Sequence, residues 1–125
     1  MRLIIAGGRD HALTKDEYAR LCLIDDLVDE VVSGGARGVD SWGELYGGKH
    51  KKRITKFPAD WKNLDAPGAI IKVGAHGRYN ANAGFQRNEE MAAYADALAV
   101  FPGGKGTEDM VRRARAHGLL IWDYR

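Results

Sequence analysis

Three short glycine-rich segments of the sequence carry the residues best suited to binding an anion. They are Gly7 to Asp10, Gly34 to Asp40 and Gly103 to Thr107, and each follows an apolar run. Glycines let the backbone turn tightly with its N–H groups pointing outward, and each segment includes an arginine or a lysine. Backbone donors combined with a cation typically bind phosphate. Three such turns favour phosphate binding over turns that only redirect the chain.

Candidate binding residues extend from these turns to the helix expected before the third turn. Arg87 begins a helical pattern in which Glu90, Met91 and Tyr94 share its face, so its guanidinium is a candidate for the same crevice. The spacing equally allows a surface Arg87 paired with Glu90 one turn further along. The candidate phosphate-binding residues are Gly7, Gly8, Arg9, Gly34, Gly35, Arg37, Gly38, Asp40, Arg87, Asn88, Gly103, Gly104, Lys105, Gly106 and Thr107.

Two further side chains have both a binding and a structural interpretation. Trp61 is a candidate for stacking on a base, although an aromatic ring packed under a long loop is at least as common. Asp40 is a candidate for contacting a ribose, or for capping the helix that follows it. The sequence leaves both pairs of alternatives open.

Apolar runs alternate with segments of helical spacing along the chain. Strands are predicted over residues 2–6, 30–32, 54–57, 97–101 and 119–122, and the run Ala97 to Phe101 is apolar throughout, as in a strand buried on both faces. The first predicted helix begins with a capping box at Thr14 and Glu17 and ends at about Asp29, and the second runs from about Trp42 to Gly47-Gly48. The third begins at Arg87, and the fourth runs from Thr107, its N-cap, to Gly118.

This alternation predicts parallel βαβ units with right-handed crossovers, and so an α/β fold with a three-layer, Rossmann-like parallel sheet of about five strands. Parallel strands end at one edge of the sheet, so the three glycine turns should meet around a single crevice. Residues 62–84 form a connection longer than ordinary loops, with a short strand predicted at Ile70 to Val73. We predict that this connection is a lid over the crevice.

The composition excludes several classes of protein. A chain of 125 residues is the length of one domain, and its net charge of +2 is too small for a general nucleic-acid coat. No secretory or membrane-spanning apolar run is present, so we expect a cytoplasmic protein. The four histidines show no ligand spacing, so no metal or other cofactor is predicted.

The single cysteine and the one dense basic run have mainly structural interpretations. Cys22 excludes an internal disulfide, and a partly buried apolar role is favoured over a nucleophilic one because no histidine is nearby in the sequence. The run from Lys49 to Arg53 precedes a predicted strand and so belongs at the amino edge of the sheet, where a solvated face is favoured over a nucleic-acid patch.

Five motifs, in chain order, carry a resemblance to a known family. They are AGGRD at 6–10, SGGARGVDS at 33–41, FPADW at 57–61, RNEEMAAYADALAVF at 87–101 and GGKGT at 103–107. The chain resembles the SLOG superfamily of Rossmann-like nucleotide-binding proteins, which includes LOG-type phosphoribohydrolases and the DNA-processing protein DprA. Within it, the chain is most similar to the small YspA/YpsA-related proteins of bacteria and phages. The resemblance implies one SLOG-like nucleotide-binding domain over residues 1–125, and leaves a homodimer open.

LOG-type enzymes hydrolyse the N-glycosidic bond of a nucleoside 5′-monophosphate. Their pattern PGGxGTxxE supplies a phosphate loop and a catalytic carboxylate, and an arginine on the preceding helix completes the site. The resemblance places this loop at 102–107 and the arginine at Arg87. Met110 stands at the glutamate position, with Glu108 and Asp109 displaced from it by two residues and one.

We therefore rank binding of a nucleotide or nucleotide-derived ligand, in a sensor or carrier role, above catalysis. The first alternative is a LOG-like phosphoribohydrolase that uses Arg87 with Asp109 or Glu108. The second is DprA-like binding of single-stranded DNA, through the Lys49 to Arg53 run and the arginines at 112, 113 and 115.

Overall fold

Five parallel strands form the central sheet of the computed structural model, which describes residues 1–125. The strands are β1 (Arg2–Ala6), β2 (Glu30–Ser33), β3 (Arg53–Lys56), β6 (Ala97–Val100) and β7 (Leu120–Asp123), and they lie in the order β3-β2-β1-β6-β7. The predicted five-stranded α/β fold is confirmed.

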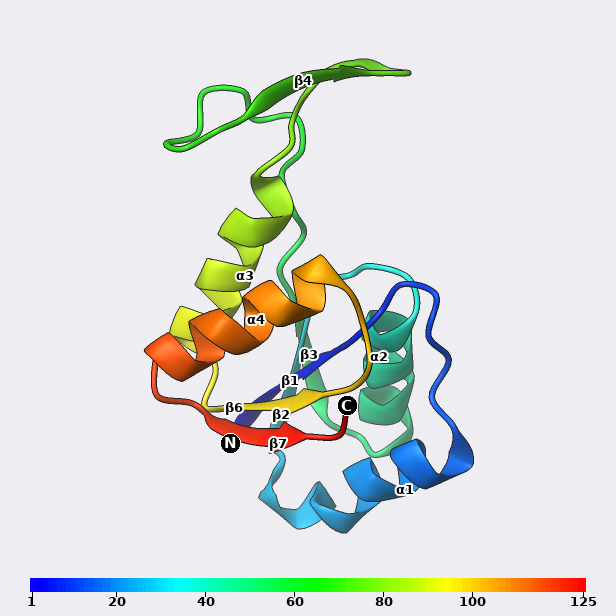
Figure 1. Cartoon of the computed structure of the whole chain (residues 1–125). Helices are drawn as coiled ribbons and strands as arrows, with labels where there is room; N and C mark the ends of the chain where they lie inside the picture. Colours follow the sequence, from blue (N-terminus) through cyan, green and yellow to red (C-terminus); the bar gives the residue numbers. More distant parts are fainter.

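Four helices cover the two faces of this sheet (Figure 1). Helices α1 (Lys15–Leu23) and α2 (Val39–Lys49) lie on one face, and α3 (Ala83–Tyr94) and α4 (Lys105–Ala116) pack together on the other. Leu3 and Ile5 of β1 enter the core under α1 and α2, whereas Ile4 and Ala6 enter the core under α3 and α4. Because side chains alternate along a strand, an apolar run serves both cores.

Helix α1 begins as predicted and ends earlier. The side chain of Thr14 accepts from the backbone N–H of Glu17, and the Glu17 carboxylate accepts from the N–H of Thr14, which completes the capping box. The prediction that this helix reaches about Asp29 is wrong, because a short 3₁₀ turn, η1 (Asp25–Leu27), follows Leu23. The Asp25 carboxylate is engaged by the Tyr46 hydroxyl at 2.6 Å, which fixes this turn against α2.

Helix α2 ends beside the glycine pair that was expected to close it, and two of its glycines also pack against the sheet. A Cβ atom on Gly43 would lie 2.9 Å from Cβ of Ile5, and one on Gly47 would lie 3.1 Å from side-chain atoms of Val31 and Ile54. These glycines therefore let α2 approach β1, β2 and β3 closely, and the helix ends at Lys49, one residue after the second glycine of the pair.

The starts of α3 and α4 differ from the sequence prediction. Helix α4 begins at Lys105 with Gly104 as its N-cap, so Thr107 lies inside the first turn and is not the cap. Helix α3 begins at Ala83, four residues before Arg87. The short strand expected near Ile70 is present as β4 (Ile71–Gly74), and it pairs with β5 (Gly77–Asn80) in a hairpin that projects beyond α3 (Figure 1). None of the helices has the length and apolarity that crossing a membrane requires.

The close packing of α2 gives a stability prediction. Gly43→Ala should lower the free energy of unfolding by about 1–3 kcal/mol, because the added methyl group overpacks the contact with Ile5. Gly48→Ala is the matched control: a Cβ there meets nothing within 4 Å, so the better helix propensity of alanine should stabilise the protein by up to about 1 kcal/mol. Urea unfolding measures both changes, and equal effects of the two substitutions would contradict this account.

Candidate functional site

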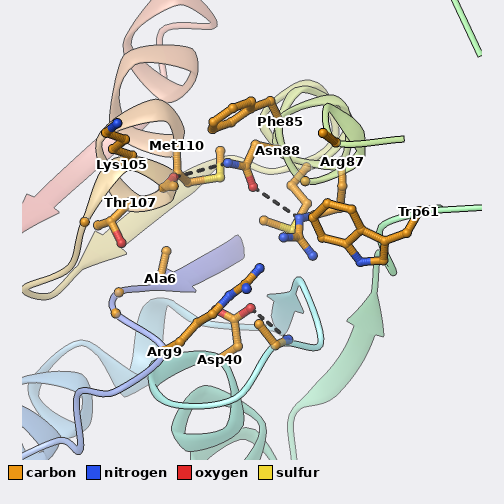
Figure 2. Close-up of a pocket in the computed structure, with 18 residues that line it drawn as sticks. Ala6, Arg9, Asp40, Trp61, Phe85, Arg87, Asn88, Lys105, Thr107 and Met110 are labelled. Atoms are coloured by element: carbon orange, nitrogen blue, oxygen red, sulfur yellow. Dashed lines mark hydrogen bonds between the residues drawn. The ribbon is translucent and has the colours of Figure 1, made fainter. Parts of the chain in front are cut away.

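A pocket of about 380 Å³ opens where the three glycine turns meet at the carboxyl edge of the sheet (Figure 2). Its volume is in the range that small-molecule sites occupy. It is lined by Ala6, Gly7, Gly8, Arg9, Ala36, Asp40, Trp61, Ala81, Gly84, Phe85, Arg87, Asn88, Met91, Gly104, Lys105, Gly106, Thr107 and Met110. Most of the residues predicted from the sequence therefore lie together in one pocket.

Two cations of this pocket are available to a ligand. Arg9 and Lys105 are exposed, and neither forms an ion pair with another residue of the chain, whereas Arg37 outside the pocket is paired with Asp10 at 3.1 Å. Figure 2 shows the Arg9 guanidinium directed into the pocket and Lys105 on the opposite wall. Long cationic side chains without an internal partner are ready to pair with an anion.

Arg87 is held inside the site by the protein itself. Its Nη1 donates to the carbonyl of Gly34 at 2.6 Å, and its Nε donates to Oδ1 of Asn88 at 3.2 Å. Burial lowers the pKa of Arg87, while the charge of Asp40 opposes this shift, so the guanidinium remains a cation at neutral pH. Its hydrogen bonds go to the crevice and not to Glu90, so the alternative of a surface pair is not what the structure shows.

The first turn of α4 forms another wall. Gly104, its N-cap, has no side chain to satisfy the first N–H groups of the helix, so the backbone around Lys105 and Gly106 remains available to a ligand. The positive end of the helix dipole adds to this site for an anion.

Asp40 is the one acidic residue that lines the pocket. Its Oδ2 accepts from the backbone N–H of Ala36 at 3.1 Å. Burial raises the pKa of Asp40, and the hydrogen bond from Ala36 and the charge of Arg87 only partly offset this effect. The structure therefore holds one carboxylate against a mainly cationic wall. The alternative in which Asp40 caps the helix is wrong, because Gly38 is the N-cap of α2 and no side chain caps it.

Aromatic rings close the side of the pocket near α3. The indole of Trp61 is 39% exposed and lies against the start of α3, where a Cβ on Gly84 would be 3.3 Å from it. Figure 2 shows this ring beside the Arg87 guanidinium, with Phe85 on the far side of Asn88. Trp61 thus borders the cavity. Of the connection predicted as a lid, residues 62–84, Ala81 and Gly84 line the pocket, whereas no residue of the β4–β5 hairpin does.

A buried amide holds the segment that carries Trp61. The backbone N–H of Asn80 donates to the carbonyl of Trp61 at 2.6 Å, and the Asn80 side chain accepts from the N–H groups of Ile70 and Asn82 and donates to Gln86 at 2.9 Å. Asn80 is fully buried. These bonds tie both ends of the long connection to the first turns of α3.

Some predicted residues lie beside the pocket and not in it. Gly34, Gly35 and Arg37 line an adjoining groove at the end of β2. Gly38 supports the turns, because it has a φ of +77° and a Cβ there would lie 2.3 Å from the carbonyl oxygen of Gly8. Gly103 lies on a separate, shallow surface.

The two carboxylates considered for catalysis also lie outside this pocket. Glu108 is exposed on the shallow surface that contains Gly103. Asp109 is 2% exposed, and it accepts from Asn88 at 3.0 Å and from Arg113 at 2.9 Å, so its charge is used inside the α3–α4 interface. Met110 lines the pocket as a buried apolar residue.

Seven lining residues are not among the site residues predicted from the sequence: Ala6, Ala36, Ala81, Gly84, Phe85, Met91 and Met110. Phe85 was missed because α3 was expected to begin at Arg87. Met91 was placed on the face of Arg87, and its spacing of four residues was the available signal.

Asp40→Asn tests the electrostatics of the site. Because burial raises the pKa of Asp40 above its unfolded value, ionisation of Asp40 opposes folding, and stability is lost as the pH rises between the two pKa values. The variant should therefore be more stable than the wild type near neutral pH, by on the order of 1 kcal/mol, and equally stable near pH 3, where both side chains are neutral. Urea unfolding at the two pH values measures this, and a less stable variant at neutral pH would contradict it.

Comparison with known proteins identifies the fold. The sequence matches no protein-family model and no curated protein sequence. Two solved structures are similar: DNA processing protein A (DprA) from Streptococcus pneumoniae, with a TM-score of 0.68 and 14% identity, and TM1055, a Northeast Structural Genomics Consortium target, with a TM-score of 0.62 and 17% identity.

The two alignments cover almost all of this chain. They include 98% of it against DprA and 96% against TM1055. The chain spans 49% of the DprA structure and 71% of the TM1055 structure. The branch of YspA/YpsA-related proteins stays a prediction. The arrangement of strands, the three glycine turns and the likeness to DprA together show that this chain has a SLOG-like Rossmann fold.

Proposed function

We propose that residues 1–125 form a domain that binds a nucleotide or nucleotide-derived ligand in this pocket, in a sensor or carrier role. The observation that carries the proposal is the open first turn of α4, flanked by two cations, Arg9 and Lys105, that have no ion-pair partner in the chain. A helix N-terminus with cations on both sides is suited to a phosphate group.

The remaining wall chemistry favours a nucleotide over inorganic phosphate. Asp40 repels an anion, but its carboxylate oxygens can accept hydrogen bonds from ribose hydroxyl groups. The Trp61 indole and the Phe85 ring offer flat apolar surfaces to a base. Phosphate, sugar and base each have a complementary region in the same cavity.

Three cations do not have equal roles in this proposal. Arg87 already donates to Gly34 and Asn88, so it shapes the crevice while contributing charge. Arg9 and Lys105 have no such bonds to lose, and they are the residues that would contact phosphate directly. Substituting Arg9 therefore tests phosphate binding without removing a hydrogen bond that shapes the crevice.

Arg9→Ala should weaken nucleotide binding about 10- to 100-fold, the loss expected for one hydrogen bond to a charged group. Isothermal titration against nucleoside mono-, di- and triphosphates, cyclic nucleotides and ADP-ribose derivatives measures it. Arg115→Ala is the matched control, because Arg115 is an exposed arginine that does not line the pocket. Absence of binding by every ligand would refute the proposal, and equal losses in the two variants would refute the role of Arg9.

The phosphoribohydrolase alternative depends on a carboxylate near the scissile bond. Met110 occupies the glutamate position of the LOG-type pattern, and Glu108 and Asp109 lie outside the pocket, which leaves Asp40 on the opposite wall. Without a carboxylate at the α4 side, an oxocarbenium-like centre there has no stabilising partner.

We therefore expect no free base when the protein is incubated with nucleoside 5′-monophosphates, as measured by chromatography. Free base that disappears in both Asp40→Asn and Arg87→Ala would instead establish hydrolysis at this site. A nucleosidase contaminant is recognised because its product would be unchanged in the two variants.

Single-stranded DNA is the second alternative, and its support is the similarity to a protein named for DNA processing. Several cations considered for it are already paired: Arg112 and Arg113 with Asp109, and Lys52 with Asp25. These pairs reduce the free positive surface on which sequence-independent binding depends. A short oligonucleotide included in the same titrations distinguishes this alternative by a steep fall in affinity with salt.

A further inference from the structure

Cys22, His50 and Asp25 lie in a row at the junction of α1, η1 and the end of α2, and none of them lines the ligand pocket. The Cys22 Sγ is 3.8 Å from His50 Nε2, and His50 Nδ1 is 3.3 Å from Asp25 Oδ1. A nucleophile within reach of a base, which is itself oriented by a carboxylate, is the arrangement that activates thiols in proteins. This arrangement is not apparent in the sequence, because Cys22 and His50 are 28 residues apart.

Asp25 is kept ionised by its surroundings. The Tyr46 hydroxyl donates to Oδ1 at 2.6 Å and lowers the pKa of Asp25, Lys52 adds a positive charge at 3.4 Å, and partial burial opposes both. An ionised Asp25 fixes the proton of neutral His50 on Nδ1 and leaves Nε2 free to accept the thiol proton. It also stabilises the imidazolium ion formed by that transfer.

His50 is held in place by more than Asp25. Its ring packs against the ring of Tyr46 with centroids 4.6 Å apart, and His50 is the C-cap of α2. The negative end of a helix dipole favours a positive charge at this position. The Tyr18 ring also faces His50, and burial raises the pKa of Tyr18, so its hydroxyl stays neutral. That hydroxyl is buried without a hydrogen-bond partner.

Cys22 itself is accessible. Its thiol is exposed, in contrast to the partly buried apolar role predicted from the sequence. Reagents from solvent therefore reach the sulfur without any rearrangement of the fold. Exposure combined with a base is typical of cysteines that are modified, and not of structural ones.

We propose that Cys22 is a reactive thiol, activated by His50 and Asp25, that forms mixed disulfides with small disulfide compounds. The thiol proton moves from Sγ to His50 Nε2, and the thiolate attacks one sulfur of the disulfide. A new S–S bond forms to Cys22 as the original S–S bond breaks. The departing thiolate takes up the proton from His50 or from water, so the step needs no other oxidant.

The thiolate fraction near neutral pH is the first test. An unassisted cysteine is only about 3% ionised at pH 7, so transfer of the thiol proton to His50 is expected to give an ultraviolet thiolate absorbance, relative to Cys22→Ser, above that level. Leu23→Cys in the Cys22→Ser background is the matched control, because position 23 is 85% exposed on the same helix and its thiol is displaced from the cysteine–histidine contact. This control thiol should show the unassisted absorbance.

The rate of reaction with an aromatic disulfide reagent is the second test. We expect the wild type to react about threefold faster than His50→Gln near pH 7, because the larger thiolate fraction is partly offset by lower nucleophilicity. This advantage should disappear near pH 10, where both thiols are ionised. Loss of rate at both pH values would instead indicate altered access and would refute activation by His50.

Two further outcomes refute the proposal: equal rates of wild type and His50→Gln near neutral pH, or a thiolate absorbance no larger than that of the Leu23→Cys control. Circular dichroism establishes whether His50→Gln is folded. If it is not, the comparison of wild type with the Leu23→Cys control decides the question alone, since it leaves His50 and Asp25 unchanged.

Discussion

The backbone of Gly8 joins the three glycine turns, and the geometry of the pocket depends on it. Its N–H donates to the carbonyl of Pro102 at 2.8 Å, and its carbonyl accepts from the N–H of Val39 at 3.2 Å. Gly8, in the turn after β1, is therefore hydrogen-bonded both to the turn after β6 and to the start of α2. Gly38 approaches the same carbonyl so closely that a Cβ atom would clash with it, so the contact between these turns requires glycine at position 38. The first helical turns of α2 and α4 are thereby fixed on opposite walls of one cavity.

This arrangement separates the charges of the chain into two groups. Away from the pocket, buried and half-buried charges are paired, as Asp109 is with Arg113 and Asp25 is with Lys52. In the pocket, Arg9 and Lys105 are left without partners, and the only carboxylate is one whose burial raises its pKa. Exposed cations elsewhere, such as Lys15 and Lys51, are also without an ion-pair partner, so the lack of a partner does not by itself distinguish the pocket. Arg9 and Lys105 differ from them in lining the same cavity as the first turn of α4, which no side chain caps.

The sequence predicted those features of the fold that depend on local pattern. The apolar runs at Arg2–Ala6 and Ala97–Val100 are strands because each alternate residue enters one of two cores, and period and composition both indicate this. The glycine pair correctly indicated the end of α2 near Gly48, but it did not reveal that Gly47 also allows close contact with the sheet, which depends on the tertiary structure. Likewise, the bonds of Asp109 to Arg113 and Asn88 depend on how α3 packs on α4, and no sequence spacing specifies that contact. Local pattern located the pocket residues, but contacts between elements determined which carboxylate faces the cavity.

Helix α2 connects the two regions of chemical interest through its polarity. Asp40 lies in its first turn and His50 caps its last, so the helix separates them by about 15 Å. The positive end of the helix dipole favours an ionised Asp40, and burial of Asp40 works against this effect. At the other end, His50 Nδ1 lies 3.3 Å from Asp25 Oδ1. Helix α2, which Gly43 and Gly47 allow to pack closely on the sheet, therefore places the Asp40 carboxyl, whose pKa burial raises, in the pocket and the His50 imidazole beside Cys22.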